Sequence, residues 1–276
     1  MTTREFLTNV TFILIVMGIG ALLEIAVPLF AAKTRRERRT ANLGLTALSF
    51  LSNWLLSSTA AILALSLRPA GLMSTVAWSA TVQITLGVLL LDFSVGYLSH
   101  YTLHMWSFLW RFHRIHHSDD FVDVTTTYRT HPVETVWRFL FAVVPVWMVG
   151  IPAQAVVIQR LLQAAWGVME HSNVRLWQPL DRLLSIVWVT PNVHKVHHSR
   201  ALAETNSNYG NVLTLYDRLL GTFTASERAY SVVYGLNDVD PSRAASLPGL
   251  LMMPFEPPDE VSDPDTKVRN ASTATR

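Results

Sequence analysis

Long apolar runs constrain this chain more than any other feature of its sequence. Residues 6–30 form a first run, which Glu24 interrupts near one end, and similar runs cover residues 43–67 and 75–98. Each is long enough to cross a bilayer as a helix. Half of the 276 residues are hydrophobic and only 15% are charged, which is too apolar for an ordinary soluble domain. The runs therefore predict an integral membrane protein.

Two shorter apolar stretches, residues 136–150 and 152–169, meet at the sequence Gly-Ile-Pro. Each stretch is short for a full span, and Gly and Pro favour a tight turn. We expect a helical hairpin that dips into the membrane and returns, whether or not it crosses fully. The predicted fold class is an all-α integral membrane protein with about four membrane-embedded helices or helix pairs and a helical cap.

A basic stretch separates the first two runs and predicts the orientation of the chain. Its cations are Lys33, Arg35, Arg36, Arg38 and Arg39. Short basic loops stay on the cytoplasmic side, so the third run should deliver His100 to the cytoplasm in a multi-pass protein. No nucleic-acid partner is expected, because the basic stretch adjoins two apolar runs rather than a soluble domain.

All ten histidines lie between positions 100 and 198. "HYTLH" (100–104) has i, i+4 spacing, and "HRIHH" (113–117) and "HKVHH" (194–198) each have i, i+3, i+4 spacing, so each phrase places its rings on one helical face. Arg114 and Lys195 should then point away, toward solvent or headgroups. The two single histidines bracket the hairpin. The candidate metal ligands are His100, His104, His113, His116, His117, His131, His171, His194, His197 and His198.

So many convergent imidazoles predict two metal ions, because one ion takes four to six ligands and neutral imidazole binds Fe, Zn, Cu or Ni. The chain has no cysteine, which excludes thiolate-ligated centres. It has no HExxH motif of a zinc protease either. Metal-bound histidines usually donate their second N–H to an acceptor. The candidate acceptors are Asp92, Glu134, Glu170, Asn173, Asn192 and Asp217.

The three histidine phrases, with "DFSVGYLSH" (92–100), "EHSN" (170–173) and "NYGNVLTLYDRLLGTF" (208–223), resemble the fatty acid hydroxylase/sterol desaturase superfamily. The resemblance covers about residues 91–223. It implies a membrane-bound, non-haem di-iron oxygenase that hydroxylates or desaturates an unactivated C–H position of a lipid. The eight histidines of the phrases would bind two iron ions, with His131 and His171 as additional ligands. Zinc could replace iron on purification.

The resemblance also divides the chain and leaves several functions open. We expect transmembrane helices in residues 1–90, a catalytic domain in 91–224, and an extension in 225–276 that is largely disordered after about 255. No cytochrome domain is fused, so electrons would come from a separate reductase, cytochrome or ferredoxin, or from a reduced pterin. An alkylglycerol-type ether-lipid monooxygenase is an alternative. More distant alternatives are a metal transporter and a zinc-dependent membrane hydrolase.

Overall fold

The computed structural model describes residues 3–31, 36–66 and 71–256. These residues form helices and connecting loops, with no strand among them and two isolated β-bridges, Pro28–Val174 and Trp188–Leu213. The prediction of an all-helical protein is therefore confirmed. Lys33, Arg35 and all but the first residues of the tail predicted to be disordered lie outside the described residues.

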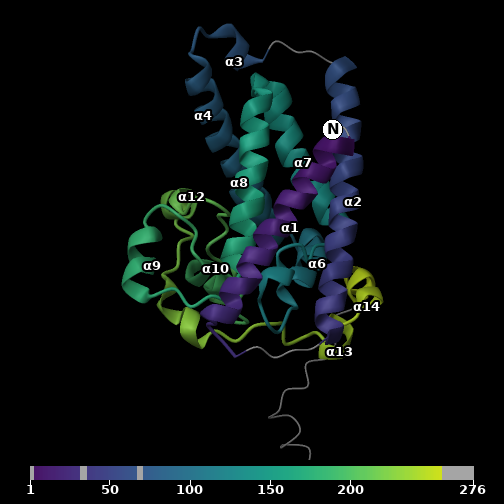
Figure 1. The fold of residues 1–276 in the computed structure, drawn as a ribbon, viewed down its shortest axis with the longest axis vertical. Coiled ribbons are helices and arrows are strands. Elements are labelled where there is room, and N and C mark those ends of the chain that lie inside the picture. The colour runs from purple at the N-terminus through teal and green to yellow at the C-terminus, as the bar shows by residue number, and fades with distance from the viewer. Residues whose placement is uncertain (1–2, 32–35, 67–70, 257–276) are drawn as a thin grey trace, which may run out of the picture.

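Long helices form a bundle, and short helices gather at one end of it as a cap (Figure 1). The bundle consists of α1 (Thr3–Ala26), α2 (Arg36–Ser66), α4 (Ala80–Leu91), α7 (Pro132–Pro145) and α8 (Ala153–His171). The cap contains α5 (Ser99–Met105), α6 (Ser107–His117), η2 (Val124–Thr126), α9 (Gln178–Leu184), α10 (Pro191–His197), α11 (Leu202–Thr205), α12 (Leu215–Leu220) and η4 (Ser226–Ser231). The C-terminal segment adds α13 (Pro241–Ala244), α14 (Leu247–Met252) and η5 (Met253–Phe255).

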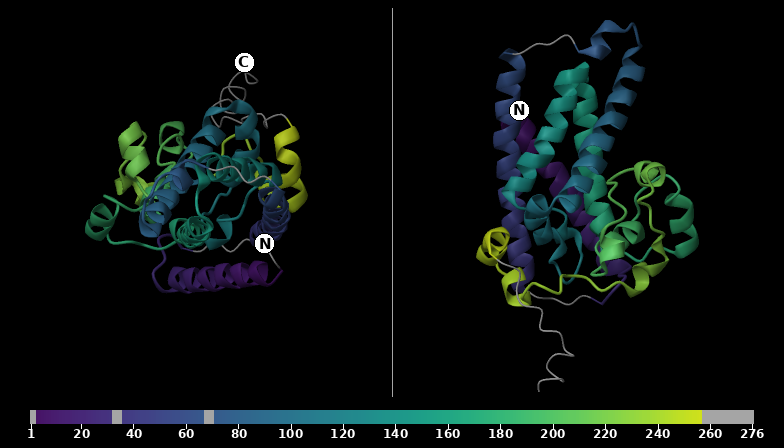
Figure 2. Two further views of the ribbon diagram at one scale, coloured as in Figure 1. Left: turned by 90° about the horizontal axis from the view of Figure 1, so that it is seen from above. Right: turned by 180° about the vertical axis from the view of Figure 1, so that it is seen from behind.

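Three helical segments in the described chain are long and apolar enough to cross a membrane: Thr3–Ala26, Ala80–Met105 and Pro132–Gly150. Their outer faces carry exposed apolar side chains, such as Ile25 at 79% and Met148 at 63% exposure. Such faces need lipid around them, so the protein is a membrane protein. Helices α2 and α8 lie beside these segments in the bundle, with α1 along one outer face (Figure 2). A fourth span and the cytoplasmic side of the cap remain predictions.

The helix of the third predicted run continues past the apolar residues and carries the first two histidines, as expected. Helix α4 continues without a break through the π-helical segment η1 (Asp92–Leu98) into α5. A π-helical turn places side chains differently from an α-helical one and is frequent at functional sites. The segment Ala80–Met105 therefore connects the apolar bundle directly to the cap.

The predicted hairpin is present, and a close backbone contact fixes its tip. It consists of α7, the π-helical η3 (Val146–Gly150) and α8, and a short helix α3 (Leu72–Thr75) packs against η3. Gly150 has a φ of +75°, which favours glycine. A Cβ atom added to Gly71 would lie 2.3 Å from the Gly150 nitrogen, so both glycines are needed for this approach.

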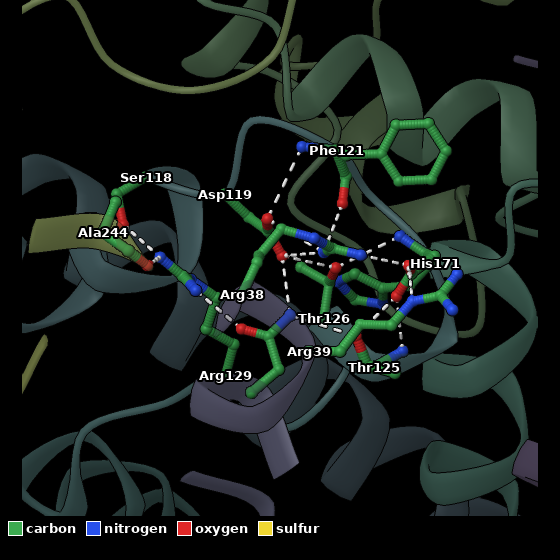
Figure 3. Close-up of polar contacts among 12 residues, drawn as sticks. Arg38, Arg39, Ser118, Asp119, Phe121, Thr125, Thr126, Arg129, His171 and Ala244 are labelled. Atoms are coloured by element: carbon green, nitrogen blue, oxygen red, sulfur yellow. Dashed lines mark hydrogen bonds and ion pairs between the residues drawn. The ribbon is translucent and has the colours of Figure 1, made fainter. Parts of the chain in front are cut away.

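The described part of the basic stretch is helical, which corrects the prediction of a basic loop there. Residues 36–39 begin helix α2, and Arg38 is buried, with ion pairs to Asp119 at 2.8 Å and to Asp123 (Figure 3). Asn42, one turn further along α2, donates to Asp119 at 2.9 Å. These bonds fix the start of α2 to the loop that follows α6.

Arg129 completes this buried polar network (Figure 3). Its guanidinium donates to the Ile115 carbonyl at 2.8 Å, to Ser118 Oγ at 2.8 Å, to Asn42 Oδ1 at 2.6 Å and to the Ala244 carbonyl at 2.8 Å. One side chain thus joins α2, the C-terminal end of α6 and the extension after residue 225. Since α6 carries three histidines, the network fixes their helix.

Helix α1 is fastened to the cap by the one acid in its apolar run. Glu24 Oε1 accepts hydrogen bonds from the backbone N–H groups of Val124 and Asn173, both at 2.8 Å. The Asn173 side chain in turn bonds the backbone of Phe30, through its Oδ1 at 3.0 Å and its Nδ2 at 2.8 Å. Glu24 therefore has a structural role at the junction of bundle and cap.

We predict that Arg129→Met lowers the free energy of unfolding by about 3–5 kcal/mol, because it leaves four buried acceptors without their donor and removes a positive charge near the buried Asp119. Arg39→Met is the matched control. Its guanidinium lies 3.8 Å from Asp123 and its side chain is 42% exposed, so it should cost less than about 1 kcal/mol. Unfolding in detergent, followed by circular dichroism, measures both, and equal losses would contradict the role of Arg129.

Candidate metal centre

Nine of the ten histidines converge in two neighbouring clusters, all of them buried. Within each cluster, the nitrogens that could bind an ion lie within 4.8 Å of one another. We call them the five-histidine cluster and the four-histidine cluster. The first consists of His100, His104, His113, His117 and His197, and the second of His116, His171, His194 and His198.

The two similar phrases contribute to both clusters in opposite proportions. In "HRIHH", His113 and His117 belong to the five-histidine cluster and the middle ring, His116, belongs to the other. In "HKVHH", the outer rings His194 and His198 belong to the four-histidine cluster and His197 to the first. Helices α6 and α10 therefore each contribute rings to both clusters, and the i, i+4 pair of each phrase faces a different cluster.

The spacing of the ring nitrogens fits a bound ion better than direct hydrogen bonds between rings. The Nε2 atoms of His171, His194 and His198 are 3.0, 3.1 and 3.2 Å apart. A neutral Nε2 offers either one proton or one lone pair, so three such atoms cannot all satisfy one another. Two nitrogens that each lie about 2.1 Å from one ion, at a right angle, are about 3 Å apart.

The five-histidine cluster shows the same fit. Its Nε2 atoms approach to 3.0 Å between His100 and His113 and to 3.1 Å between His100 and His197. The Nε2 atoms of His104 and His117 are buried and have no hydrogen-bond partner within the described chain. Unpaired nitrogens in a dry interior are unfavourable, and a metal ion would satisfy them.

Acceptors outside the five-histidine cluster hold most of its rings. The Nδ1 atom of His100 donates to the Tyr209 carbonyl at 2.8 Å, and that of His197 to the Ser207 carbonyl at 2.7 Å. His113 Nδ1 lies 3.0 Å from Glu134 Oε2, and His104 Nδ1 lies 3.3 Å from the Asn206 amide oxygen. Donation from Nδ1 leaves the Nε2 lone pair directed into the cluster.

The rings of the four-histidine cluster are held less completely. His171 Nδ1 donates to the Gly167 carbonyl at 2.6 Å. His194 Nδ1 lies 3.7 Å from Glu170 Oε2, beyond hydrogen-bonding range. The Nδ1 atoms of His116 and His198 have no partner among the described residues. The two clusters therefore differ both in ligand number and in how firmly their rings are oriented.

Three of the six predicted acceptors lie beside the clusters. Glu134 contacts His113 and also accepts from Arg138 Nε at 2.8 Å. Glu170 accepts from Asn211 at 2.8 Å and faces His194. Asp217 acts one step removed: it accepts from the backbone N–H groups of Tyr209 and Gly210, both at 2.8 Å, and Tyr209 holds His100.

The other three predicted acceptors serve different purposes. Asp92 is buried in η1 near the backbone N–H groups of residues 212 and 213, and in the described chain it makes no hydrogen bond to a histidine. Asn173 binds Phe30, as described above. Asn192 Nδ2 donates to the Leu176 carbonyl at 3.2 Å. Both asparagines hold loops of the cap rather than imidazoles.

His131 is the one predicted ligand that the structure does not bring to a cluster. It is the N-cap of α7, where its Nδ1 accepts from the Val133 N–H at 3.2 Å. Its ring packs between Phe112 and Phe255, with ring centres 5.1 and 6.1 Å away. A histidine directly before a proline is well placed to begin a helix. Because its Nδ1 accepts the capping bond, the proton of the neutral ring lies on Nε2, the atom through which the clustered histidines face one another.

The expectation that Arg114 and Lys195 point toward solvent is wrong. Lys195 is fully buried and its Nζ donates to the Ser172 carbonyl, next to His171. Burial lowers the pKa of Lys195 to about 7. Arg114 is buried against Asp238 at 2.7 Å, in the extension that follows the cap. Helices α6 and α10 are covered on the side opposite the clusters, so their basic residues bind protein groups.

Burial favours the neutral form of five of the clustered histidines. It lowers the pKa of His197 from 6.5 to about 3. For His116, His117, His194 and His198, burial first and neighbouring imidazoles second hold the pKa well below 6.5. Neutral imidazole is the form that binds metals.

Sequence reasoning missed the main acceptors, which are the backbone carbonyls of Gly167, Ser207 and Tyr209. A carbonyl carries no residue-type signal, so only the fold could reveal it. Asn206 and Arg138 did carry a signal. Asn206 follows the third histidine phrase closely, and Arg138 lies four residues after Glu134 on the same face of α7.

Comparison with known proteins assigns the family. Residues 84–222 match the fatty acid hydroxylase family, and the chain belongs to it. The chain is 35% identical over 160 residues to ornithine lipid hydroxylase OlsE of Rhizobium tropici. These residues cover 58% of this chain and 47% of that protein. It is 27% identical over 142 residues to alkylglycerol monooxygenase of Caenorhabditis elegans and 30% over 141 residues to that of Danio rerio.

These alkylglycerol monooxygenase matches each cover 51% of this chain, and 27% and 30% of the two relatives. The chain thus spans less than half the length of these curated relatives. The matched region contains all ten histidines. No solved structure matches the chain.

We predict that His104→Ala removes about one metal ion per chain, whereas His131→Ala leaves the metal content unchanged. His104 has a buried nitrogen directed into the five-histidine cluster, and His131 only caps α7. The His131 change should cost about 1 kcal/mol of stability through the lost cap. Metal analysis of the purified variants measures the content, and loss of an ion from His131→Ala would restore that residue to the ligand set.

We also predict that stability falls as the pH drops from 6.5 toward about 3. In this range the histidines of the unfolded chain bind protons, whereas the buried rings of the folded protein do not. The free energy of unfolding therefore falls by up to about 1.4 kcal/mol per pH unit for each histidine. Protons also compete with a metal ion for the imidazole nitrogens, which lowers the stability further as the pH falls. Thermal unfolding across this range should show a steep acid limb that is shallower in His117→Asn. A flat profile below pH 6.5 would contradict the assignment of neutral rings.

Proposed function

We propose that the protein is a membrane-bound di-iron hydroxylase that inserts one oxygen atom of dioxygen into an unactivated C–H bond of a membrane lipid. The observation that carries this proposal is the pair of buried, all-imidazole clusters beside the apolar bundle, in a chain of the fatty acid hydroxylase family. The nine clustered histidines are the proposed ligands.

The number and type of the ligands favour iron over zinc. A zinc site usually has four ligands, and a catalytic one uses three from the protein. The five-histidine cluster exceeds that number. Nine neutral ligands leave the positive charge of two ions uncompensated, which suits an oxidising centre more than a structural one. Two iron ions bound there would supply dioxygen activation, with two electrons from a separate donor or a reduced pterin.

The residues of the chain would orient and shield this centre. Glu134 and the carbonyls of Tyr209 and Ser207 keep Nε2 of their histidines directed inward. Burial of all nine rings excludes bulk water from the clusters. The continuous segment Ala80–Met105 connects the lipid-facing bundle to His100 and His104, so the clusters would lie close to the lipid. We place the cap on the cytoplasmic side, from the basic residues that lead into α2 and begin it.

The relatives support a membrane lipid as substrate. The ornithine lipid hydroxylase match has higher identity and covers more of this chain than the alkylglycerol monooxygenase matches. We therefore favour hydroxylation of an acyl or headgroup carbon, and keep ether-lipid oxidation as the second candidate. The two are chemically distinguishable. Hydroxylation beside an ether oxygen gives a hemiacetal, which separates into an aldehyde and a free alcohol, whereas other positions give a stable alcohol.

The test compares lipid extracts of cells that produce the unchanged protein, His113→Ala or His131→Ala. We expect a lipid heavier by one oxygen atom with the unchanged protein and His131→Ala, and its absence with His113→Ala. Loss of an ether lipid with release of an aldehyde would instead indicate the second candidate. Identical lipid profiles in all three samples would contradict a lipid oxygenase.

The metal is tested on purified protein, stripped by a chelator and reloaded. Zinc often outcompetes ferrous iron for such ligands, so the metal present after purification does not decide the question. Oxygen consumption with lipid should return with iron and an electron donor, and should not return with zinc. Lipid turnover with zinc and without dioxygen would identify a hydrolase.

A further inference from the structure

Two short helices of the cap share a sequence pattern that the metal centre does not explain. Asp-Arg-Leu-Leu occurs in α9 at 181–184 and again in α12 at 217–220. In both copies the aspartate is buried, and the arginine and both leucines are exposed. Because the pattern and its burial are the same in both copies, we expect the two helices to have the same role.

The buried aspartates fasten both helices to the core of the cap. Asp181 accepts from the hydroxyl of Thr190, at the start of α10, and from Ser226. Asp217 accepts from the backbone N–H groups of Tyr209 and Gly210. These bonds determine which face of each helix turns inward, so the opposite face is held outward by the fold.

The outward faces are strongly apolar. Leu219 is 73% exposed, Leu183 65% and Ile186 59%, and Val187, Leu215 and Leu220 are also exposed. Single exposed apolar residues are ordinary, but a continuous apolar patch marks an interaction site. We call these six residues the apolar shelf. Neither acidic residue of the two helices reaches it. The exposed charges of these helices are Arg182, which pairs with Glu227 of η4 at 3.2 Å, and Arg218, which donates to the Ser185 carbonyl at 2.8 Å.

The shelf is one connected surface rather than two separate loops. The Thr214 N–H donates to the Val187 carbonyl at 3.0 Å, and its hydroxyl donates to the Ser185 carbonyl at 3.0 Å. Trp188 forms a β-bridge with Leu213. The segment after α9 is therefore bonded along its length to the start of α12.

The shelf is also continuous with a candidate membrane span. The Tyr216 hydroxyl donates to the Leu89 carbonyl at 2.8 Å, and its ring lies 5.2 Å from that of Phe93. Figure 1 shows α12 on the side of the cap nearest the bundle, beside the lower end of α4, and the rear view in Figure 2 agrees. Leu86 and Leu89, on the same span, are themselves exposed.

We propose that the apolar shelf rests in the lipid bilayer, as a second membrane contact beside the spanning helices. Helices of six or seven residues cannot cross a membrane, but their apolar side chains can enter its outer layer by about 5–10 Å. Arg182 and Arg218 would lie at the level of anionic headgroups, where long basic side chains are favoured. The contact would hold the cap, and with it α10 and its histidines, against the membrane surface.

This proposal rests on the membrane location of the protein and not on its oxidation chemistry. A protein that proves to be inactive toward lipids can still have the shelf in the bilayer. Conversely, a shelf outside the bilayer would leave the metal clusters and the proposed reaction intact.

The absence of cysteine makes the test direct. Single cysteines replace Leu183, Leu219 or Val233, each variant is labelled with bimane, and one metal-loaded chain is placed in each phosphatidylcholine–phosphatidylglycerol nanodisc. Val233 is a matched control, because it is 60% exposed in the segment between η4 and α13, which runs along the end of the molecule away from the bundle (Figure 1). Lipids with bromine on the upper acyl carbons quench a label that enters the bilayer.

We expect brominated lipid to quench the labels at 183 and 219 by about half or more, and to leave the label at 233 unchanged. Adding Leu219→Glu should reduce the quenching at 183 about twofold, and adding Val233→Glu should not change it. Equal quenching at all three positions, or none at 183 and 219 in chains with a full metal content, would overturn the proposal. Protection of the labels only in discs with two chains would assign the shelf to a second copy, which also overturns it.

Discussion

Nine imidazole rings buried in one small volume are the constraint on which the rest of this structure depends. Each neutral ring presents a donor nitrogen and an acceptor nitrogen, and a dry interior penalises either one when it is unpaired. The Nε2 atoms point at one another within two clusters, so a shared cation in each cluster would satisfy them. The fold supplies acceptors on the other side, from carbonyls and from Glu134.

The two repeated phrases gain a physical meaning from this arrangement. An i, i+3, i+4 pattern places two rings in one line and a third ring slightly around the helix. In α6 the i, i+4 pair faces the five-histidine cluster, and in α10 it faces the other. Because each helix contributes to both clusters, displacement of either helix would disturb both. Two buried cations hold these helices in place. Arg129 donates to the Ile115 carbonyl of α6, and Lys195 of α10 donates to the Ser172 carbonyl.

The parts of this structure that follow from local chain geometry could be predicted from the sequence. Apolar runs predicted the helices of the bundle, because a helix in lipid satisfies its own backbone and needs only length and apolar side chains. Helical spacing predicted that the rings of each phrase would share a face. Contact between residues distant in sequence could not be predicted. The division into five and four rings, the capping role of His131 and the burial of Lys195 all depend on how α6, α8 and α10 pack.

The most direct test of the central claim is anomalous diffraction at the iron edge from crystals of the iron-loaded protein. The account predicts two peaks, one surrounded by the Nε2 atoms of the five-histidine cluster and one by those of the four-histidine cluster, with each of α6 and α10 contributing to both. A single peak, or a peak at His131, would contradict it.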